Sequence, residues 1–264
     1  MPHGARVQWR YLVHHQYVLI TMHRNFLPLM LLALAGCDKI EHPITTGGNH
    51  GGRGNGVVTK RVLLEDYTAW HCIYCPEGHQ IAQQLHNTYG EDLILVGIHG
   101  SGLADPGYYP TNTDFTTTAG NSYFANWSVN GLPKGMVNRV PYEGVVPMER
   151  VKWGEATAAL IALPAKMDLW IEPPTYDGSN TVDATIKIAV AEDLGDTTYK
   201  LVVYLIEDHV IDWQFSSLAS PNDVEFYDHR HVLRDNLNGT WGNGGNGTSG
   251  GQWNLKLSKA GELK

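Results

Sequence analysis

The chain has 264 residues, of which 42% are hydrophobic and 17% charged, so it can bury a core in one or two domains. Its formal net charge of −8 argues against a nucleic-acid partner, because phosphate binding needs a basic surface. The chain has three cysteines, so one is left over if the other two form a disulfide. We expect Cys37 to be lipidated and Cys72 to pair with Cys75.

An apolar run at residues 26–36 follows Arg24 and ends in small residues directly before Cys37. The run is shorter than the roughly 20 residues that span a bilayer, and it suits the core of a signal peptide. Leu34 to Cys37 resembles the bacterial lipobox, which predicts a lipid anchor on Cys37 and a signal peptide over residues 1–37. Residues 1–21 fit a signal peptide poorly, so we expect the true start at Met22. The alternative is a buried helix that ends at a free Cys37.

Residues 38–56 are rich in glycine and cannot bury enough surface to fold alone. They predict a flexible tether that reaches about 20–25 Å from the membrane.

We expect folded structure to begin near Val57, with a buried strand at 62–64, a helix that starts after Cys75 and a second strand at 93–98. The apolar face of the helix contains Ile81, Ala82, Leu85 and Tyr89, and Gly90 is typical of a helix end. The Cys-x-x-Cys spacing therefore lies at a strand-to-helix junction within a β-α-β pattern. This context predicts a thioredoxin-like redox domain over residues 57–164.

The helix start explains the predicted chemistry of the cysteine pair. Unpaired backbone N–H groups and the helix dipole stabilise a thiolate, so Cys72 is the expected nucleophile and Cys75 the resolving cysteine. Asp66 lies six positions before Cys72. Thioredoxins carry a buried proton-accepting acid at that offset, and by this resemblance Asp66 is a candidate for the role. The alternative is a strand residue that faces solvent.

Gly131-Leu132-Pro133 precedes an expected strand at 136–140. Thioredoxin-like folds place a cis-proline before a strand and opposite the cysteine pair, so the resemblance predicts a cis bond at Pro133. Leu132 would then offer its backbone to an extended substrate. We expect Trp70, His71 and Leu132 to line the substrate groove.

Two alternatives to redox chemistry remain open for the cysteine pair. A purely structural disulfide would close only a four-residue loop, which stabilises the fold little. A metal site would need more ligands than this pair with His71 and His79, so we expect neither metal nor cofactor. We expect the histidines near Asp208 and at 229–231 to be solvated or hydrogen-bonded rather than metal ligands.

The remaining chain is expected to contain a long insertion at 101–130 near the active face, and a helix at 147–163 that Pro164 ends. From Met167 the pattern becomes β, with a half-buried strand at 182–190, an interior strand at 201–206 and a further strand at 253–257. These strands predict a sandwich-like all-β domain over residues 165–264.

The sequence resembles the Omp28-related outer-membrane lipoproteins of the Bacteroidetes. The matching stretches are 62–68, Cys72 to Glu77, 96–99, 131–139, 231–234 and 239–242. The resemblance implies a thioredoxin-like domain followed by a β-rich domain on a periplasmic or surface-facing outer-membrane lipoprotein. It also implies that the last strand or two lies beyond this sequence.

Two functions are therefore expected. The first is an extracytoplasmic thiol–disulfide oxidoreductase that acts on the thiols or disulfides of envelope proteins and is held to the membrane through Cys37. The second is a surface adhesion or ligand-binding lipoprotein whose disulfide is not catalytic, because fold alone does not fix function.

Overall fold

The computed structural model describes residues 6–8, 17–23, 60–107, 113–176, 181–191, 194, 198–246 and 252–260. The predicted signal run at 26–36, the lipidation site Cys37 and the tether at 38–56 lie outside the described residues. Among the described helices, none has the length and hydropathy needed to cross a membrane.

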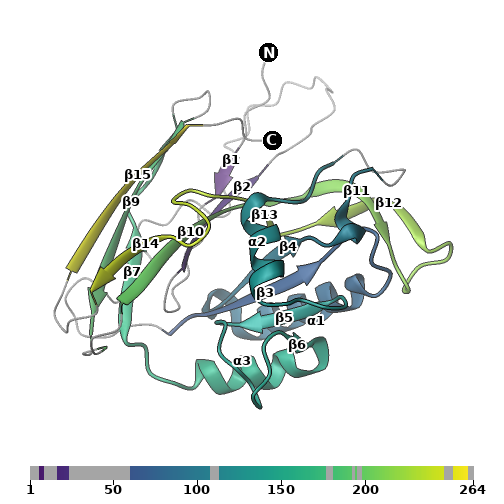
Figure 1. Cartoon of the computed structure of the whole chain (residues 1–264), viewed down its shortest axis with the longest axis horizontal. Coiled ribbons are helices and arrows are strands. Elements are labelled where there is room, and N and C mark those ends of the chain that lie inside the picture. The colour runs from purple at the N-terminus through teal and green to yellow at the C-terminus, as the bar shows by residue number, and fades with distance from the viewer. Residues whose placement is uncertain are drawn as a thin grey trace, which may run out of the picture.

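The described elements form one large mixed α/β arrangement with a projecting β-hairpin (Figure 1). The helices are α1 (Cys75–Tyr89), α2 (Thr118–Asn126) and α3 (Trp153–Ile161), with short 3-10 turns η1 (Gly90–Asp92), η2 (Gly102–Ala104) and η3 (Arg150–Lys152). The strands are β1 (Arg6–Gln8), β2 (Tyr17–His23), β3 (Val62–Thr68), β4 (Leu93–His99), β5 (Lys134–Val137), β6 (Met148–Glu149), β7 (Met167–Ile171), β8 (Thr175–Tyr176), β9 (Thr181–Val190), β10 (Thr198–Asp208), β11 (Val210–Phe215), β12 (Asp223–His229), β13 (Val232–Asn236), β14 (Asn243–Asn246) and β15 (Gln252–Ala260).

The central sheet has the strand order β1-β2-β10-β13-β4-β3-β5-β6, and β14 pairs with β10 outside this path. Strands β3 and β4 are parallel, as a β-α-β unit requires, and β5 is antiparallel to β3. All seven residues of β3 are buried because helices cover both faces of the sheet. One core cluster joins β3 and β4 to α2, and another joins them to α1 and α3. The predicted β-α-β unit is confirmed.

Helix α1 begins and ends close to where the sequence indicates. Its buried or half-buried face includes Ala82 and Leu85, and Gly90 lies at its C-terminal end. Gly90 has φ 57°, a left-handed conformation that glycine adopts without steric cost, and its N–H donates to the carbonyl of His86.

Strand β10 faces two cores at once. Odd-numbered side chains from Leu201 to Leu205 pack with β7 and β9, whereas even-numbered ones from Val202 to Ile206 pack with α2 and the central sheet. The prediction of an interior strand at 201–206 is confirmed by its complete burial. Strands β10 and β13 follow Pro164 in the chain, yet they belong to the sheet that carries β3 and β4.

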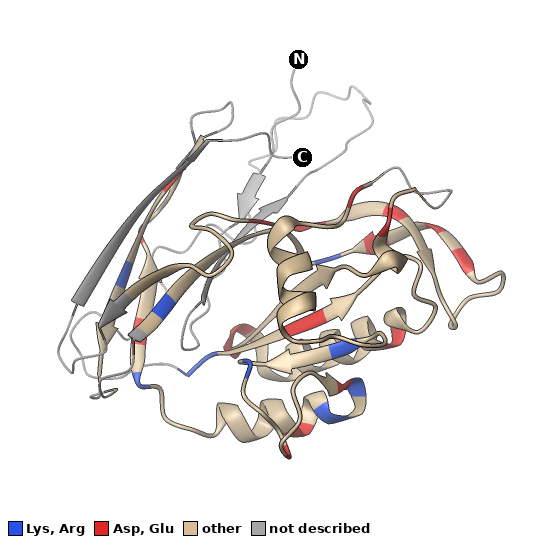
Figure 2. Cartoon of the chain, in the orientation of Figure 1, with Lys and Arg blue, Asp and Glu red and all other residues tan. Residues whose placement is uncertain are grey.

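The described chain after α3 contains strands without further helices. Strands β15, β9 and β7 form a second sheet with β8 paired to β9, and β11 pairs with β12 in a separate hairpin. Acidic and basic side chains are scattered over the coloured elements of Figure 2 and form no continuous basic stripe in that view.

The strand expected at 136–140 ends earlier, at Val137. Asn138 and Arg139 both have positive φ, 53° and 54°. Asn138 leaves the ladder because its side-chain oxygen accepts a hydrogen bond from Leu63 N at 2.7 Å while its own N–H donates to Leu63 O at 2.8 Å. The turn directs Arg139 inward, where it pairs with the buried Glu65.

The helix expected at 147–163 is also shorter and begins at Trp153. The Val146–Pro147 bond is cis, Met148 and Glu149 pair with β5, and η3 follows before the helix starts. The alanine-rich pattern correctly indicates a helix. The first residues of the expected helix instead pair with the neighbouring strand, because tertiary contacts outweigh helix propensity there. The helix ends at Ile161, three residues before Pro164.

Candidate functional site

The cysteine pair is oxidised and lies at the start of α1. A disulfide joins Cys72 to Cys75, whose Cα atoms are 5.4 Å apart. Cys75 is the first residue of the helix and Pro76 the second, where a missing N–H leaves no helical bond unmade. The intervening turn is closed by Cys75 N donating to Cys72 O at 3.2 Å. The disulfide therefore occupies the helix N-terminus, as the sequence predicts.

The segment Leu132–Pro133 lies against the disulfide and the first turns of α1. The bond between these residues is cis, as predicted. Leu132 packs against a small cluster formed by Cys72, Cys75 and two alanines. A Cβ at Gly78 would lie 3.1 Å from Pro133, so the glycine permits this close approach.

The β11–β12 hairpin covers the disulfide. Phe215 N donates to Trp70 O at 2.8 Å, and Ser217 N donates to Ile73 O at 2.7 Å. The Gln214 amide nitrogen reaches Cys72 O at 3.1 Å and the carbonyl of the alanine at position 69 at 3.3 Å. Cys72 is only 4% exposed and Cys75 is fully buried, and the side chains packed with them are those of Ala69, Ala104 and Leu132.

Two of the predicted groove residues, Trp70 and His71, contact this hairpin. Trp70 is fully buried and stacks on His71, which in turn makes an edge contact with Phe215 of β11. The start of the 101–130 insertion approaches from another side, since Leu103 O accepts a hydrogen bond from His71 N. A groove that includes Trp70 therefore requires the hairpin to move.

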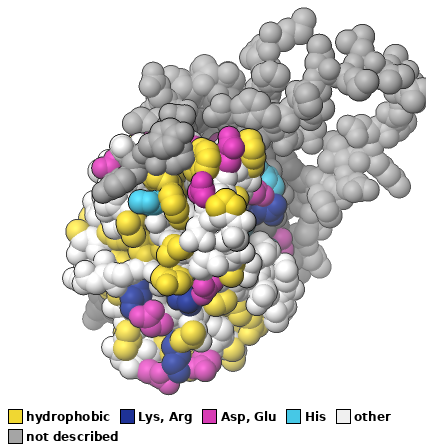
Figure 3. Space-filling view, turned by 90° about the vertical axis from the view of Figure 1, so that its right-hand side faces the viewer, with side chains coloured by type: hydrophobic (Ala, Val, Ile, Leu, Met, Phe, Trp, Pro, Cys, Tyr) yellow, Lys and Arg dark blue, Asp and Glu magenta, His cyan; other side chains and the backbone are white. Residues whose placement is uncertain are grey.

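The outer side of the hairpin is apolar at several positions. Figure 3 views the molecule from the hairpin side and shows hydrophobic side chains scattered over this face. Ile211, Leu218, Phe226 and Tyr74 are each more than half exposed.

Asp66 is buried rather than solvent-facing. It lies in β3 between β4 and β5, is 5% exposed, and its side chain is on the face of the sheet that α1 covers. Burial raises the pKa of this carboxyl well above its usual range. One carboxyl oxygen lies 3.7 Å from His79 Nε2, and the other has no hydrogen-bond partner among the described residues.

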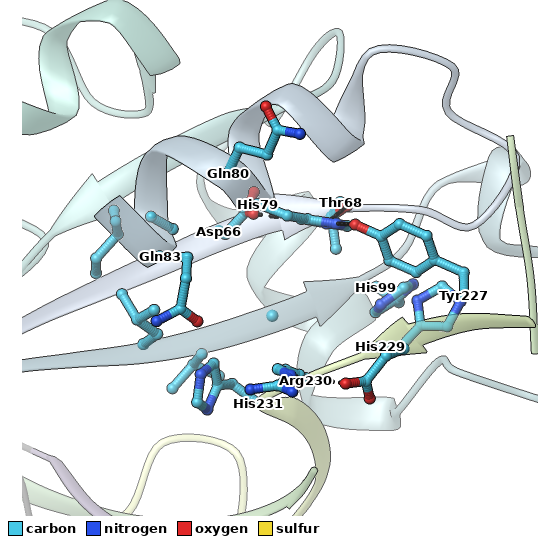
Figure 4. A pocket seen from close by; sticks show the side chains of 16 residues that line it. Asp66, Thr68, His79, Gln80, Gln83, His99, Tyr227, His229, Arg230 and His231 are labelled. Atoms are coloured by element: carbon cyan, nitrogen blue, oxygen red, sulfur yellow. Dashed lines mark hydrogen bonds and ion pairs between the residues drawn. The ribbon is translucent and has the colours of Figure 1, made fainter. Parts of the chain in front are cut away.

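A cavity of about 490 Å³ lies beside Asp66, between α1, the sheet and β12 (Figure 4). His79 extends across it from α1, with Nε2 2.9 Å from the Thr68 hydroxyl and Nδ1 2.7 Å from the Tyr227 hydroxyl. His99 and His229 form an adjacent wall, with ring centroids 5.5 Å apart.

Burial keeps these imidazoles neutral. It lowers the pKa of His79 to about 3 and that of His229 to about 4, and it also lowers the pKa of His99 well below its usual range. Burial raises the pKa of Tyr227 for the same reason.

The sequence did not indicate this grouping of residues. His79 lies in the helix and His99 at the end of the second strand of the predicted unit, but Tyr227 and His229 come from a hairpin about 130 to 150 positions later, and no local signal links them. Two other histidines form ion pairs: His231 with Asp208 at 3.0 Å, and His209 with Asp228 at 3.1 Å. In the part of the chain that the structure describes, no group of three or more His, Cys, Asp or Glu side chains is arranged to hold a metal ion.

Comparison with protein families gives a match to the outer membrane protein Omp28 model over residues 120–252. The chain belongs to the Omp28 family. Membership of a family of outer membrane proteins indicates a location in the cell envelope. The matched range includes Pro133, α3 and the hairpin, but it begins after the cysteine pair.

Two solved structures are similar to this Omp28 protein. HBP35 of Porphyromonas gingivalis aligns with a TM-score of 0.51 and 17% identity, over 76% of this chain and 64% of its own. A crystal structure of an Agrobacterium tumefaciens protein aligns with a TM-score of 0.42 and 12% identity, over 76% of this chain and 79% of its own. The chain thus spans less than two thirds of HBP35, and at this identity the likeness concerns the fold alone. No curated protein matches the sequence.

Proposed function

We propose that this Omp28 protein is an exported thiol–disulfide oxidoreductase that acts on thiols or disulfides of other envelope proteins. The observation that carries the proposal is the placement of the Cys72–Cys75 disulfide at the N-terminus of α1, with Leu132 packed against it. Unpaired backbone N–H groups at that position favour a thiolate once the pair is reduced.

The proposed reaction is a two-electron exchange. A substrate thiolate attacks Cys72 Sγ, so that a mixed disulfide forms and Cys75 leaves as a thiolate that takes up a proton. The second substrate thiolate then attacks the substrate sulfur of the mixed disulfide. This step forms the substrate disulfide and releases the Cys72 thiolate. The protein disulfide gains the two electrons that the substrate dithiol loses, and a second disulfide partner reoxidises the pair. Asp66 is the proposed acceptor and donor of the proton at Cys75.

The hairpin cover sets a condition on this reaction. A substrate thiolate reaches Cys72 only after the contacts of Gln214, Phe215 and Ser217 with the cysteine loop have opened. Trp70, His71 and Leu132 are the proposed walls of the groove that opening would expose.

The finer organisation of the chain is part of the proposal. We infer that residues 1–37 are a signal peptide, that Cys37 carries the lipid anchor and that residues 38–56 are the tether. We also infer a thioredoxin-like domain over 57–164 and a β-rich, sandwich-like domain over 165–264. The predominance of strands after α3 supports this division, whereas the participation of β10 and β13 in the central sheet means that the two parts share structure.

The test combines a redox titration with trapping on the full chain. We expect a reduction potential above about −300 mV, because structural disulfides lie below that value. Cys75→Ser should accumulate a mixed disulfide when the Cys72 thiolate attacks a substrate peptide that contains a disulfide and releases one substrate thiolate, whereas Cys72→Ser should not. A potential below that limit, together with no trapping by either variant, would contradict the proposal.

The second candidate is an adhesion or ligand-binding protein with an inert disulfide, and the burial of both cysteines favours it. The two functions differ in one measurable property. An inert disulfide resists reduction in the native protein at all times, whereas a catalytic one is reduced at the rate at which the hairpin opens.

A further inference from the structure

The cavity beside Asp66 is lined by buried polar atoms that have no hydrogen-bond partner among the described residues. These atoms are Asp66 Oδ1, His99 Nδ1 and His229 Nδ1. Their residues are 5%, 3% and 2% exposed. A buried polar atom without a partner costs free energy, so three of them at one cavity indicate that something else supplies the partners.

The hydrogen-bonding roles at the cavity follow from the contacts of each ring. His229 Nε2 lies 3.1 Å from Trp213 O, and a carbonyl only accepts, so this nitrogen carries the proton. In the neutral ring His229 Nδ1 is then an acceptor that requires a donor. The protonated Asp66 carboxyl and the neutral His99 ring can each either donate or accept.

The cavity wall carries little net charge. Its buried histidines are neutral, and burial favours the neutral form of Asp66. The charged Arg230 and Asp228 at its border pair with each other at 2.8 Å. A charged ligand would lose its hydration shell without gaining an opposite charge.

The rest of the wall contains apolar and aromatic side chains beside the polar Thr68, Gln80 and Gln83. Leu64, Ala82 and Leu95 form the part between the sheet and α1. The rings of His99, Tyr227 and His229 lie together at the other end, as Figure 4 shows. A sugar would place several hydroxyls against the aliphatic wall without partners, whereas an aromatic ring would lose nothing there.

We propose that this cavity binds a small uncharged aromatic molecule that carries a hydroxyl group, with the hydroxyl donating to His229 Nδ1 and the ring lying against Leu64, Ala82 and Leu95. The volume of about 490 Å³ is within the range of small-molecule sites. The argument for this site does not rest on the proposed redox function, although Asp66 belongs to both.

The test is isothermal titration calorimetry of the full chain with 4-ethylphenol and three comparison compounds. The methyl ether of 4-ethylphenol has the same ring but no donor, and we expect it to bind at least about tenfold more weakly. Glucose represents a neutral sugar and benzoate an aromatic anion, and neither should bind measurably at the concentration that saturates with 4-ethylphenol.

Two variants locate the binding. His229→Phe removes the nitrogen proposed to accept from the hydroxyl, and Gln83→Trp fills space beside the cavity from α1. Both should weaken 4-ethylphenol binding about tenfold or more. Gln84→Trp is the matched control, because Gln84 is the next residue of α1, is exposed and does not line the cavity.

Three results would overturn the proposal. They are the absence of 4-ethylphenol binding, equal binding of the methyl ether, and binding that Gln83→Trp and Gln84→Trp leave equally strong. Preferential binding of glucose or benzoate would assign the cavity to a different class of ligand and would also refute it.

Discussion

Asp66 combines deep burial with an ionisable group. Its carboxyl is among apolar side chains of β3 and β4, and the nearest ring nitrogen, His79 Nε2, belongs to an imidazole that burial keeps neutral. Charging Asp66 therefore costs free energy in the folded protein that it does not cost in the unfolded chain. The folded state binds this proton more tightly, so this group reduces stability as the pH rises above the unfolded-state pKa.

Asp66→Asn should stabilise the fold, and the gain should increase from pH 5 to pH 8. The amide has nearly the same shape and avoids the cost of a buried charge. Thermal melting of both proteins at the two pH values measures the effect. Glu91→Gln, which changes an exposed carboxylate, is the control and should shift the melting temperature little at either pH. A loss of stability at pH 8 would show that the charged form of Asp66 is bound favourably.

The buried imidazoles act in the opposite direction. His229 has a pKa of about 4 in the folded protein against 6.5 in a free side chain, so the unfolded chain takes up a proton first as the pH falls. At 1.36 kcal/mol per unit, lowering the pH from 7 to 4 should cost about 3 kcal/mol through His229 alone. Urea unfolding at pH 7 and pH 4 should show a smaller acid loss in His229→Phe than in the wild type. An equal loss in both proteins would contradict this assignment.

At the scale of elements, we expect the hairpin β11–β12 to limit access to the disulfide. It is attached through backbone bonds to the cysteine loop, through Gln214, and through Ser217, whose hydroxyl donates to Glu77 at 2.7 Å. It also reaches the cavity, because Tyr227 on its second strand bonds to His79.

Gln214→Ala should accelerate reduction of the disulfide by dithiothreitol about tenfold. The substitution removes two hydrogen bonds between the hairpin and the cysteine loop, each with a net value of roughly 0.5–1.5 kcal/mol. The rate is followed by alkylation of the freed thiols and mass spectrometry. Phe226→Ser, at a 77% exposed position on the same hairpin, is the control and should leave the rate unchanged. Equal rates in all three proteins would mean that the hairpin does not limit access.

A second set of contacts ties the elements of the central sheet together. Arg139 forms a bidentate ion pair with the fully buried Glu65, and both hydrogen bonds are 2.7 Å long. Both side chains also form a hydrogen bond with the Tyr204 hydroxyl of β10. Arg139 also lies over the Tyr123 ring of α2 at 4.2 Å.

Arg139→Met should destabilise the protein by about 3–5 kcal/mol, because it leaves the Glu65 carboxylate buried and unpaired. Adding Glu65→Leu to this variant should recover much of the loss, since the double variant contains no orphaned charge. Denaturant unfolding of the three proteins gives the comparison. A double variant that is less stable than Arg139→Met would show that the ion pair itself, rather than the orphaned charge, determines the cost.

The β-α-β unit could be predicted because its signals are local: an apolar strand, a helix with one apolar face, Gly90 and the cysteine spacing. The cis bond before Pro133 followed from the resemblance to thioredoxins. Neither the position of the hairpin at the disulfide nor the cavity could be predicted. Gln214 and Tyr227 contact the cysteine loop and α1 from about 140 residues away in the sequence. Likewise, Asn138 ends its strand through a contact with Leu63 that depends on the assembled sheet.

At the scale of the whole molecule, β10 is the element that links the two sheets (Figure 1). Leu205 is 1% exposed and packs toward β7 and β9, whereas the next residue, Ile206, packs toward α2. The same backbone therefore carries side chains of both cores, and β10 cannot leave one core while it stays in the other.

Leu205→Ala should lower the free energy of unfolding by about 2–5 kcal/mol, as deletion of a buried leucine side chain usually does. Because β10 is shared, hydrogen exchange should accelerate by a similar factor in β9 and in β3, although Leu205 faces β9. Mass spectrometry of peptides from both strands measures this. Acceleration limited to β9 would mean that the two cores unfold separately.

The sharing of β10 and β13 has a consequence for the order in which the chain can fold during synthesis and export. The cysteine pair lies early in the sequence, but β4 gains its neighbour β13 only when residues 232–236 have emerged. Until then one edge of the sheet is open and its backbone groups are unpaired. The emerging cysteines therefore lie beside an incomplete sheet, accessible to cellular thiol oxidants, until first the hairpin and then β13 have emerged.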